Sequence, residues 1–233
     1  MIISHKHKFI FIKPQKTAGT SIELLLSRIC GDEDIITPLG NDPDPNVREK
    51  HQAKNPQNFK RPKPFKLWEV REFYWLLTKG IVPNLNYKEH LTPDIIKSYV
   101  GEEIWNSYKK ISIVRNPWDH AVSWFKWQAK YGYEKTNPND FEGYIRKNYR
   151  TIWPFFTTHG VYDIDFMIRF EEMETDIKKL AEILPEIGGF NIPQTKNKIR
   201  NDNKTYHGYF NETTKSIVEE KSCNILKKFN YSF

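Results

Sequence analysis

The stretch that decides the fold is FIKPQKTAGTSIELLL, from Phe11 to Leu26. It joins the end of an apolar run, KFIFI, to a loop with lysines, threonines, a serine and one glycine. Thr20 and Glu23 have the spacing of a capping box, so a helix is predicted to begin inside the stretch. Apolar residues then follow with helical i, i+3, i+4, i+7 spacing, at Ile22, Leu25, Leu26 and Ile29. The stretch predicts a strand, a loop and a helix whose amino-terminal N–H groups form an anion site.

The same alternation recurs along the chain. KISIV (Lys110–Val114) and DFMIRF (Asp165–Phe170) are predicted to be strands, and a helix follows each of them. RNPWDHAVSWF turns from the first of these strands into a helix, with Asn116 as N-cap. Further helices are predicted at 67–81, after Thr92 in HLTPDIIKSYV, and at 214–229. We therefore predict an α/β fold with a central, mostly parallel sheet flanked by helices.

Composition limits the organisation and the class of ligand. The chain has 233 residues, of which 38% are hydrophobic, so we expect one domain over 1–233 with an irregular insertion at about 38–64. No apolar run is long enough for a membrane span and no signal peptide is evident, so we expect a soluble, cytoplasmic protein. Cys30 and Cys223 are expected to be small buried hydrophobes. A net charge of +7 favours an anionic ligand, although scattered lysines often form only a solvated surface.

The loop differs from the ATP-binding pattern G-x-x-x-x-G-K-[ST]. Lys16 precedes the only glycine of the loop, Gly19, and no glycine opens it. The strand at 110–114 ends in Arg115 rather than in the acidic residue that would hold Mg²⁺, so no metal is expected. Ser123 lies eight positions after Arg115, about two helical turns on, so both side chains could reach one phosphate. Two such anion sites suit a nucleotide that is phosphorylated at both its 5′ and 3′ positions.

The motif pair resembles that of a known family. PQKTAGTSIE followed by SIVRNPWDHAVSWF is similar to the 5′-phosphosulfate and 3′-phosphate motifs of the sulfotransferase superfamily, closest to its carbohydrate and heparan-type group with bacterial relatives. The likeness extends to HLTPDII, RFEEM and the closing KKFNYSF, and covers nearly the whole chain except 38–64. The resemblance implies a P-loop-like three-layer fold and transfer of a sulfuryl group from 3′-phosphoadenosine 5′-phosphosulfate (PAPS) to a hydroxyl, with adenosine 3′,5′-bisphosphate as product. The expected acceptor is a carbohydrate or small molecule and not a nucleic acid.

The resemblance also implies roles for individual residues. Arg115 and Ser123 match the pair that holds the 3′-phosphate, and Lys16 would neutralise the charge that grows on the leaving phosphate oxygen. The loop that wraps the 5′-phosphosulfate corresponds to Lys16, Thr17, Ala18, Gly19, Thr20 and Ser21.

Two positions depart from the family pattern. Many relatives have an arginine where this chain has His120, so the 3′-phosphate could be supported elsewhere, by Lys126 or by TKNKIRNDNK at 195–204. Relatives can use a histidine three residues before the loop lysine as catalytic base, and here that residue is Lys13. His90 is the candidate base, because similar proteins have a histidine in the matching H-x-T segment and histidine titrates near neutral pH. The alternatives are a packing role for His90, with Lys13 or His51 as the base.

Other features have competing interpretations. Trp118, Trp124, Phe125 and Trp127 could stack on a base or sugar, but their helical spacing favours the core for most of them. Glu171 could orient a group of the site, although pairing with a lysine is the simpler expectation. A solvated loop is favoured over acceptor recognition for Lys60, Arg61, Lys63 and Lys66. Two alternative functions remain, a kinase of the P-loop class and a non-enzymatic module that binds nucleic acid or an anionic glycan.

Overall fold

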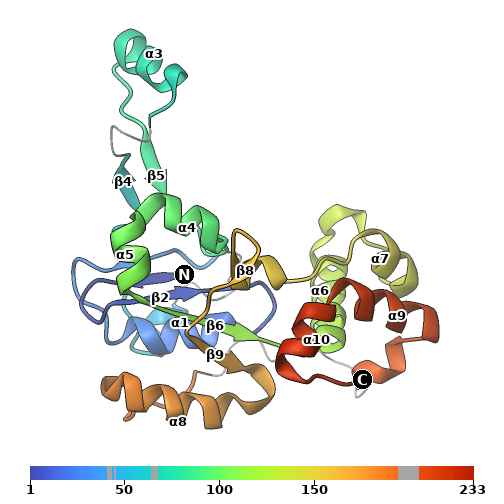
Figure 1. The fold of residues 1–233 in the computed structure, drawn as a ribbon. Coiled ribbons are helices and arrows are strands. Elements are labelled where there is room, and N and C mark those ends of the chain that lie inside the picture. The colour runs from blue at the N-terminus through green and yellow to red at the C-terminus, as the bar shows by residue number, and fades with distance from the viewer. Residues whose placement is uncertain (41–43, 45, 64–67, 194–204) are drawn as a thin grey trace.

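The computed structural model describes residues 1–40, 44, 46–63, 68–193 and 205–233 (Figure 1). Its strands are β1 (Ile2–Ser4), β2 (Phe9–Ile12), β3 (Ile35–Ile36), β4 (Lys60–Pro62), β5 (Asn84–Asn86), β6 (Lys109–Val114), β7 (Thr157–Thr158), β8 (Val161–Tyr162) and β9 (Phe166–Arg169). Its α-helices are α1 (Gly19–Ser27), α2 (Val47–Lys50), α3 (Val70–Lys79), α4 (Pro93–Val100), α5 (Glu102–Ser107), α6 (Pro117–Tyr131), α7 (Phe141–Lys147), α8 (Met173–Ile183), α9 (Glu212–Lys221) and α10 (Cys223–Phe229). The 3-10 turns are η2 (Tyr133–Lys135), η3 (Trp153–Phe156), η4 (Phe170–Glu172), η5 (Pro185–Ile187) and η7 (Tyr206–Tyr209).

The central sheet has the strand order β3-β1-β2-β6-β9. β2, β6 and β9 are parallel neighbours, with Ile12 opposite Ser112 and Val114 opposite Arg169. β1 is antiparallel to both of its neighbours, so the remaining strands share one direction. The loops that follow β2, β6 and β9 therefore leave the sheet at the same edge, where ligands bind in open α/β sheets.

Helices cover both faces of the sheet. Alternate strand residues point to opposite sides, and in β2 the residues on both sides are apolar, so each side packs against helices. Phe9 and Phe11 of β2 belong to a hydrophobic cluster with α1 and α8, whereas Ile10 and Ile12 belong to a second cluster with α4 and α5. Figure 1 shows α1 and α8 on one side of the sheet and α4 and α5 on the other. The predicted three-layer α/β fold with a mostly parallel sheet is confirmed.

A third cluster packs the helices that follow β6 and those near the carboxyl terminus. Trp118 and Phe125 of α6 lie with Tyr144 of α7 and Val218 of α9 in this cluster. The predicted helix at 214–229 is two helices, because the backbone leaves helical geometry at Ser222. The Ser222 hydroxyl lies 2.8 Å from the Tyr149 hydroxyl in the buried interior.

Several sequence expectations need correction. Strands β1 and β3 were not predicted, and the segment expected to be irregular contains α2 and β4. Contacts hold the two elements in place, because Arg48 of α2 pairs with Glu23 at 2.9 Å and β4 pairs with β5. Cys30 is buried as expected, but Cys223 is exposed at the start of α10.

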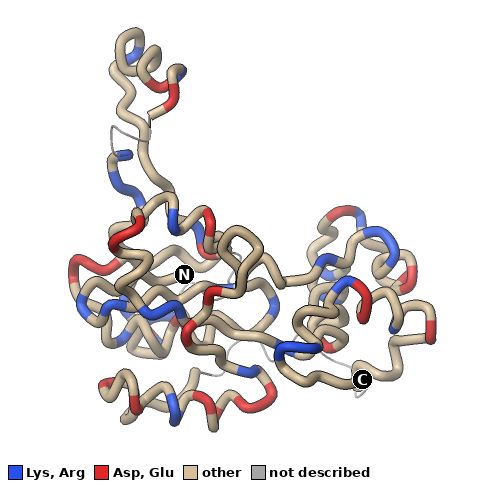
Figure 2. The backbone as a smooth tube through the Cα atoms, viewed as in Figure 1, with Lys and Arg blue, Asp and Glu red and all other residues tan. Residues whose placement is uncertain are grey.

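Charged residues are distributed over the whole molecule. Figure 2 shows Lys and Arg interspersed with Asp and Glu along the helices and loops of the described chain. Among the described residues, no helix has the length and apolarity required to cross a bilayer.

Candidate active site

The loop between β2 and α1 has an unusual backbone. Lys16 and Ala18 both adopt left-handed conformations, with φ of 61° and 64°. Ala18 is the N-cap of α1, and its own side chain makes no cap hydrogen bond to the first N–H groups of this helix. The Thr17 hydroxyl donates to the carbonyl of Pro14 at 3.1 Å and so braces the turn. Strained, uncapped backbone at a helix start is the arrangement by which proteins bind anions.

The predicted capping box at Thr20 is wrong. Thr20 lies inside α1, and its expected partner Glu23 is fully buried against other groups. Glu23 accepts from Lys13 Nζ at 2.9 Å, from Arg48 at 2.9 Å and from the Met1 amine at 3.0 Å. A buried carboxylate requires such cationic partners. Glu23 therefore binds them in place of the backbone N–H that a capping box would have used.

Gly19 is required by close packing rather than by backbone conformation. A Cβ atom at this position would lie 2.7 Å from Cγ of Lys13. The aliphatic stem of Lys13 therefore crosses the start of α1, where only a hydrogen atom leaves room for it.

Lys13 is held as an ammonium ion. Besides Glu23, it pairs with Glu89 at 2.7 Å, and its side chain is almost fully buried. Burial opposes the charge, but the two carboxylates outweigh it and raise the pKa of Lys13 above its usual value. A lysine whose pKa is raised holds its proton at neutral pH, which argues against Lys13 as the catalytic base.

His90 lies directly beside the loop. Its Nδ1 is 2.8 Å from the carbonyl oxygen of Lys13, and its Nε2 is 3.4 Å from Oε1 of Glu89. Because a carbonyl only accepts, Nδ1 donates to it, and Nε2 faces the Glu89 carboxylate. The Glu89 carboxylate would stabilise the imidazolium that forms when Nε2 accepts a proton. The His90 side chain remains 28% exposed, so solvent-borne groups can reach it.

Glu89 is the residue that the sequence analysis missed. It accepts from Lys13, lies beside His90 and also accepts from the backbone N–H of Gly40 at 2.9 Å. Burial opposes its negative charge, but His90 and Lys13 together lower the pKa of Glu89 far below its usual value. Its position next to His90 in KEHLT was the available signal.

His51 lies at the opposite end of α1 from the loop. Its carbonyl accepts from Arg28, the C-cap residue of α1, at 2.8 Å. Nine helical residues span about 14 Å. The structure therefore gives His51 no contact with the loop start that would support it as base.

Arg115 meets the loop from the end of β6. Its Nη1 donates to the carbonyl of Lys16 at 3.1 Å, and its guanidinium lies 4.1 Å from the ring centroid of Phe170. Its Nε donates to the carboxylate of Asp119 in a short ion pair. Ser123 is half-buried on α6 four residues after Asp119, and so on the same helical face. The structure thus brings Arg115 against the loop and places Ser123 on the helical face that carries Asp119.

His120 does not replace the family arginine as a cation. Its Nε2 donates to the carbonyl of Gln15 at 3.1 Å, which ties α6 to the loop. Burial, followed by the nearby positive charge of Arg115, lowers the pKa of His120 to about 4, so the ring is neutral at physiological pH. Lys126, one alternative cation, lies over the ring of Tyr209 at 5.1 Å. The other alternative, the stretch 195–204, lies outside the described residues.

The aromatic residues of α6 divide into two groups. Trp118 and Phe125 are buried in the third cluster, as expected. Trp124 and Trp127 are only half-buried; Trp124 stacks on His120, and Lys16 Nζ lies 5.3 Å from the ring centroid of Trp127.

Among the lysines that the structure describes, none pairs with Glu171, contrary to expectation. It accepts from the backbone N–H of Asn116 at 2.7 Å and from the hydroxyl of Tyr231 at 2.7 Å. It therefore anchors the start of α6 and the carboxyl-terminal tail. No group of three or more His, Cys, Asp or Glu side chains within the described ranges could hold a metal ion.

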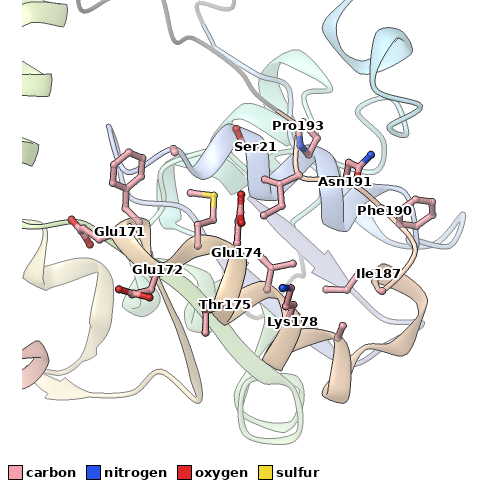
Figure 3. A pocket seen from close by; sticks show the side chains of 17 residues that line it. Ser21, Glu171, Glu172, Glu174, Thr175, Lys178, Ile187, Phe190, Asn191 and Pro193 are labelled. Carbon is pink, nitrogen blue, oxygen red and sulfur yellow. The ribbon is translucent and has the colours of Figure 1, made fainter. Parts of the chain in front are cut away.

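An open cavity of about 930 Å³ adjoins the loop. Ala18 and Ser21 form its edge at the loop, and α8 and residues 187–193 form much of its remaining wall. Figure 3 shows Ser21 on one side of the cavity and Thr175 and Lys178 of α8 on the other. Phe170, whose ring contacts the Arg115 guanidinium, also lines it. One cavity therefore extends from the loop to the residue that supports Arg115.

Comparisons with known proteins give distant structural likenesses. No protein-family model matches the chain, and a search of curated proteins found no match. The crystal structure of mouse sulfotransferase SULT7A1 complexed with PAP is 14% identical, with 97% of this chain and 90% of that chain covered and a TM-score of 0.48. Retinol dehydratase in complex with androsterone and inactive cofactor PAP is 16% identical, with coverage of 99% and 84% and a TM-score of 0.46. Retinol dehydratase with retinol and PAP gives 17%, the same coverage and a TM-score of 0.45.

Proposed function

We propose that this chain is a PAPS-dependent sulfotransferase that transfers a sulfuryl group to a hydroxyl, with a carbohydrate as the acceptor class. The observation that carries the proposal is the contact between the Arg115 guanidinium and the Lys16 carbonyl at 3.1 Å. This contact places the arginine at the end of β6 beside the loop that leads into α1, where the N-cap side chain makes no hydrogen bond. The cavity that adjoins the loop is large enough for a nucleoside. A ligand with phosphates at both ends of a nucleoside matches this arrangement better than one with a single phosphate chain.

The residues present fit such a ligand. The N–H groups at the start of α1 suit the 5′-phosphosulfate, and Arg115 with Ser123 suits the 3′-phosphate. The Arg115 guanidinium already donates to Asp119 and to the Lys16 carbonyl, so these two hydrogen bonds fix its orientation before a ligand binds. Phe170 holds the guanidinium plane from one face.

Two side chains are assigned to the chemistry. PAPS supplies an activated sulfuryl group, and the bond to be broken joins its sulfur to a phosphate oxygen. Lys16, in the loop two residues before the N-cap of α1, would neutralise that oxygen as it leaves. His90 Nε2 takes the proton of the acceptor hydroxyl as the new S–O bond forms, and Glu89 stabilises the resulting imidazolium. Lys13, held between two carboxylates, orients Glu89 and the loop start.

The alternative functions fit less well. A kinase of the P-loop class needs an acidic metal ligand near the end of β6, where this chain has Arg115, and Glu171 is already held by Asn116 and Tyr231. A module that binds nucleic acid or an anionic glycan would need a clustered basic surface. In the described chain, basic and acidic residues are interspersed (Figure 2).

The test is nucleotide binding followed by transfer. Calorimetry should give tight binding of adenosine 3′,5′-bisphosphate and much weaker binding of ATP, and added Mg²⁺ should not reverse the order. Labelled PAPS should then transfer its sulfuryl group to a member of a panel of glycans and small alcohols. Equal or tighter binding of ATP would favour the kinase, and binding of neither nucleotide would contradict the proposal.

A further inference from the structure

A projecting arm belongs to the parts of the described chain that the proposed function does not use. The arm consists of residues 60–63 and 68–86, with the β4–β5 pair at its base and α3 near its tip (Figure 1). Phe59, Leu85 and Tyr87 anchor the base in the second hydrophobic cluster. No described residue from 68 to 82 belongs to any of the three clusters.

The tip is nevertheless well ordered by local contacts. Glu69 and Glu72 form a capping box at the start of α3, and Gly80 ends the helix in a left-handed conformation. Lys63 pairs with Glu72 at 2.9 Å, and the Trp68 indole donates to the carbonyl of Lys63 at 2.8 Å. The helix is therefore formed before any partner is bound, so binding does not carry the cost of folding it.

One face of this helix exposes apolar side chains. Val70, Tyr74 and Leu77 follow i, i+4, i+7 spacing, and their exposed fractions are 88%, 62% and 85%. Ile81 and Val82 continue the surface at 49% and 48%. Single exposed apolar residues are common, but a contiguous stripe on a preformed helix marks an interaction surface.

The charge of the arm favours an anionic partner. Its two acidic residues, Glu69 and Glu72, pair with two of its five basic residues, Arg71 and Lys63 respectively. The other three basic residues, Lys60, Arg61 and Lys79, leave the arm with a net charge of +3. A second copy of this chain, with a net charge of +7, would bring a second basic arm and a basic body against the surface. Anionic lipid headgroups complement the basic residues, while an acyl layer accepts the apolar stripe.

We propose that the arm binds the surface of a membrane that contains anionic lipids, with α3 lying in the interface. Ten helical residues extend about 15 Å, half the hydrocarbon thickness, so α3 rests on the bilayer and does not cross it. Tyr74 and the half-buried Trp75 belong to the residue types that favour the membrane interface. The proposal does not depend on the sulfotransferase activity.

The test is flotation of the full chain with lipid vesicles. The probes are vesicles of phosphatidylcholine alone and vesicles with 30% phosphatidylserine, each at low and physiological salt. We expect binding to the anionic vesicles that weakens with salt and at least tenfold weaker binding to the neutral ones. Val70→Ser/Tyr74→Ser/Leu77→Ser should lower binding to anionic vesicles at least tenfold. Lys60→Gln/Arg71→Gln/Lys79→Gln should lower it severalfold and reduce its dependence on salt.

Matched controls distinguish binding through the arm from non-specific binding through any exposed apolar side chain. Val161, 70% exposed on β8, provides the control Val161→Ser, which should bind as the unaltered chain does. Circular dichroism and nucleotide affinity should be unchanged in the triple variants, because the substituted side chains are outside the core. Failure of the full chain to bind anionic vesicles would overturn the proposal. So would a dimer in analytical ultracentrifugation that the apolar triple variant abolishes, because a second copy would then cover the stripe.

Discussion

Removal of the Arg115 side chain should selectively weaken binding of a 3′-phosphorylated nucleotide. A charge-assisted fork to a phosphate contributes about 2 to 4 kcal/mol. In this structure Nε is shared with Asp119 and Nη1 with the Lys16 carbonyl, so the lower half of that range applies. Arg115→Ala should therefore cost about 2 to 3 kcal/mol, or about 30- to 140-fold in affinity for adenosine 3′,5′-bisphosphate. Adenosine 5′-monophosphate lacks the 3′-phosphate, so its affinity should change less than about threefold.

Titration calorimetry with both nucleotides measures the selectivity, and a second strand-end arginine provides the control. Arg169 ends β9 and pairs with Asp176 at 2.7 Å, so Arg169→Ala also removes a paired arginine but lies outside the proposed site. It should leave both affinities unchanged. Ser123→Ala combined with Arg115→Ala should be non-additive, because both side chains would serve one phosphate. If Arg115→Ala weakens both nucleotides equally in a folded protein, Arg115 only supports the loop and the assignment of the 3′-phosphate is wrong.

Three further changes test the chemistry and the loop. Lys16→Ala should lower turnover by a larger factor than it weakens bisphosphate binding, because its charge is needed most as the leaving oxygen becomes anionic; unchanged turnover would remove Lys16 from the mechanism. His90→Gln should reduce sulfuryl transfer about 100-fold or more with nearly unchanged bisphosphate affinity, and a full rate would assign the base elsewhere. The pKa of His120 is about 4 in the folded chain, below its unfolded value of 6.5, so its contribution to stability is complete above pH 6.5 and is lost as the pH falls towards 4. The loss amounts to about 3 kcal/mol, and denaturant unfolding of His120→Gln should show a shallower pH dependence over that window; an equal slope would mean that His120 is not buried as a neutral ring.

Short-range sequence patterns determined the three parallel strands of the central sheet and the helices that follow them. KFIFI, KISIV and DFMIRF are short apolar runs, each followed by helical periodicity, and each forms a parallel strand of the central sheet. Asn116 caps α6 through its side chain, as its position before Pro117 predicted. The strand-end position of Arg115 followed from the same pattern, because parallel strands end at one edge of a sheet. These features depend on interactions between residues that are a few positions apart, and such interactions can be predicted directly from the sequence.

Long-range packing decided the rest. Lys13 meets Glu89 across 76 positions and His90 across 77, and His120 meets Gln15 across 105. Spacing along the chain does not predict such long-range contacts, since they depend on the strand order and register of the sheet. The charge state of Lys13 follows from two carboxylates that only the folded chain brings to it. The stripe on α3 is the converse case, because amphipathic periodicity specifies a helix with an apolar face, whereas only the tertiary structure leaves that face exposed.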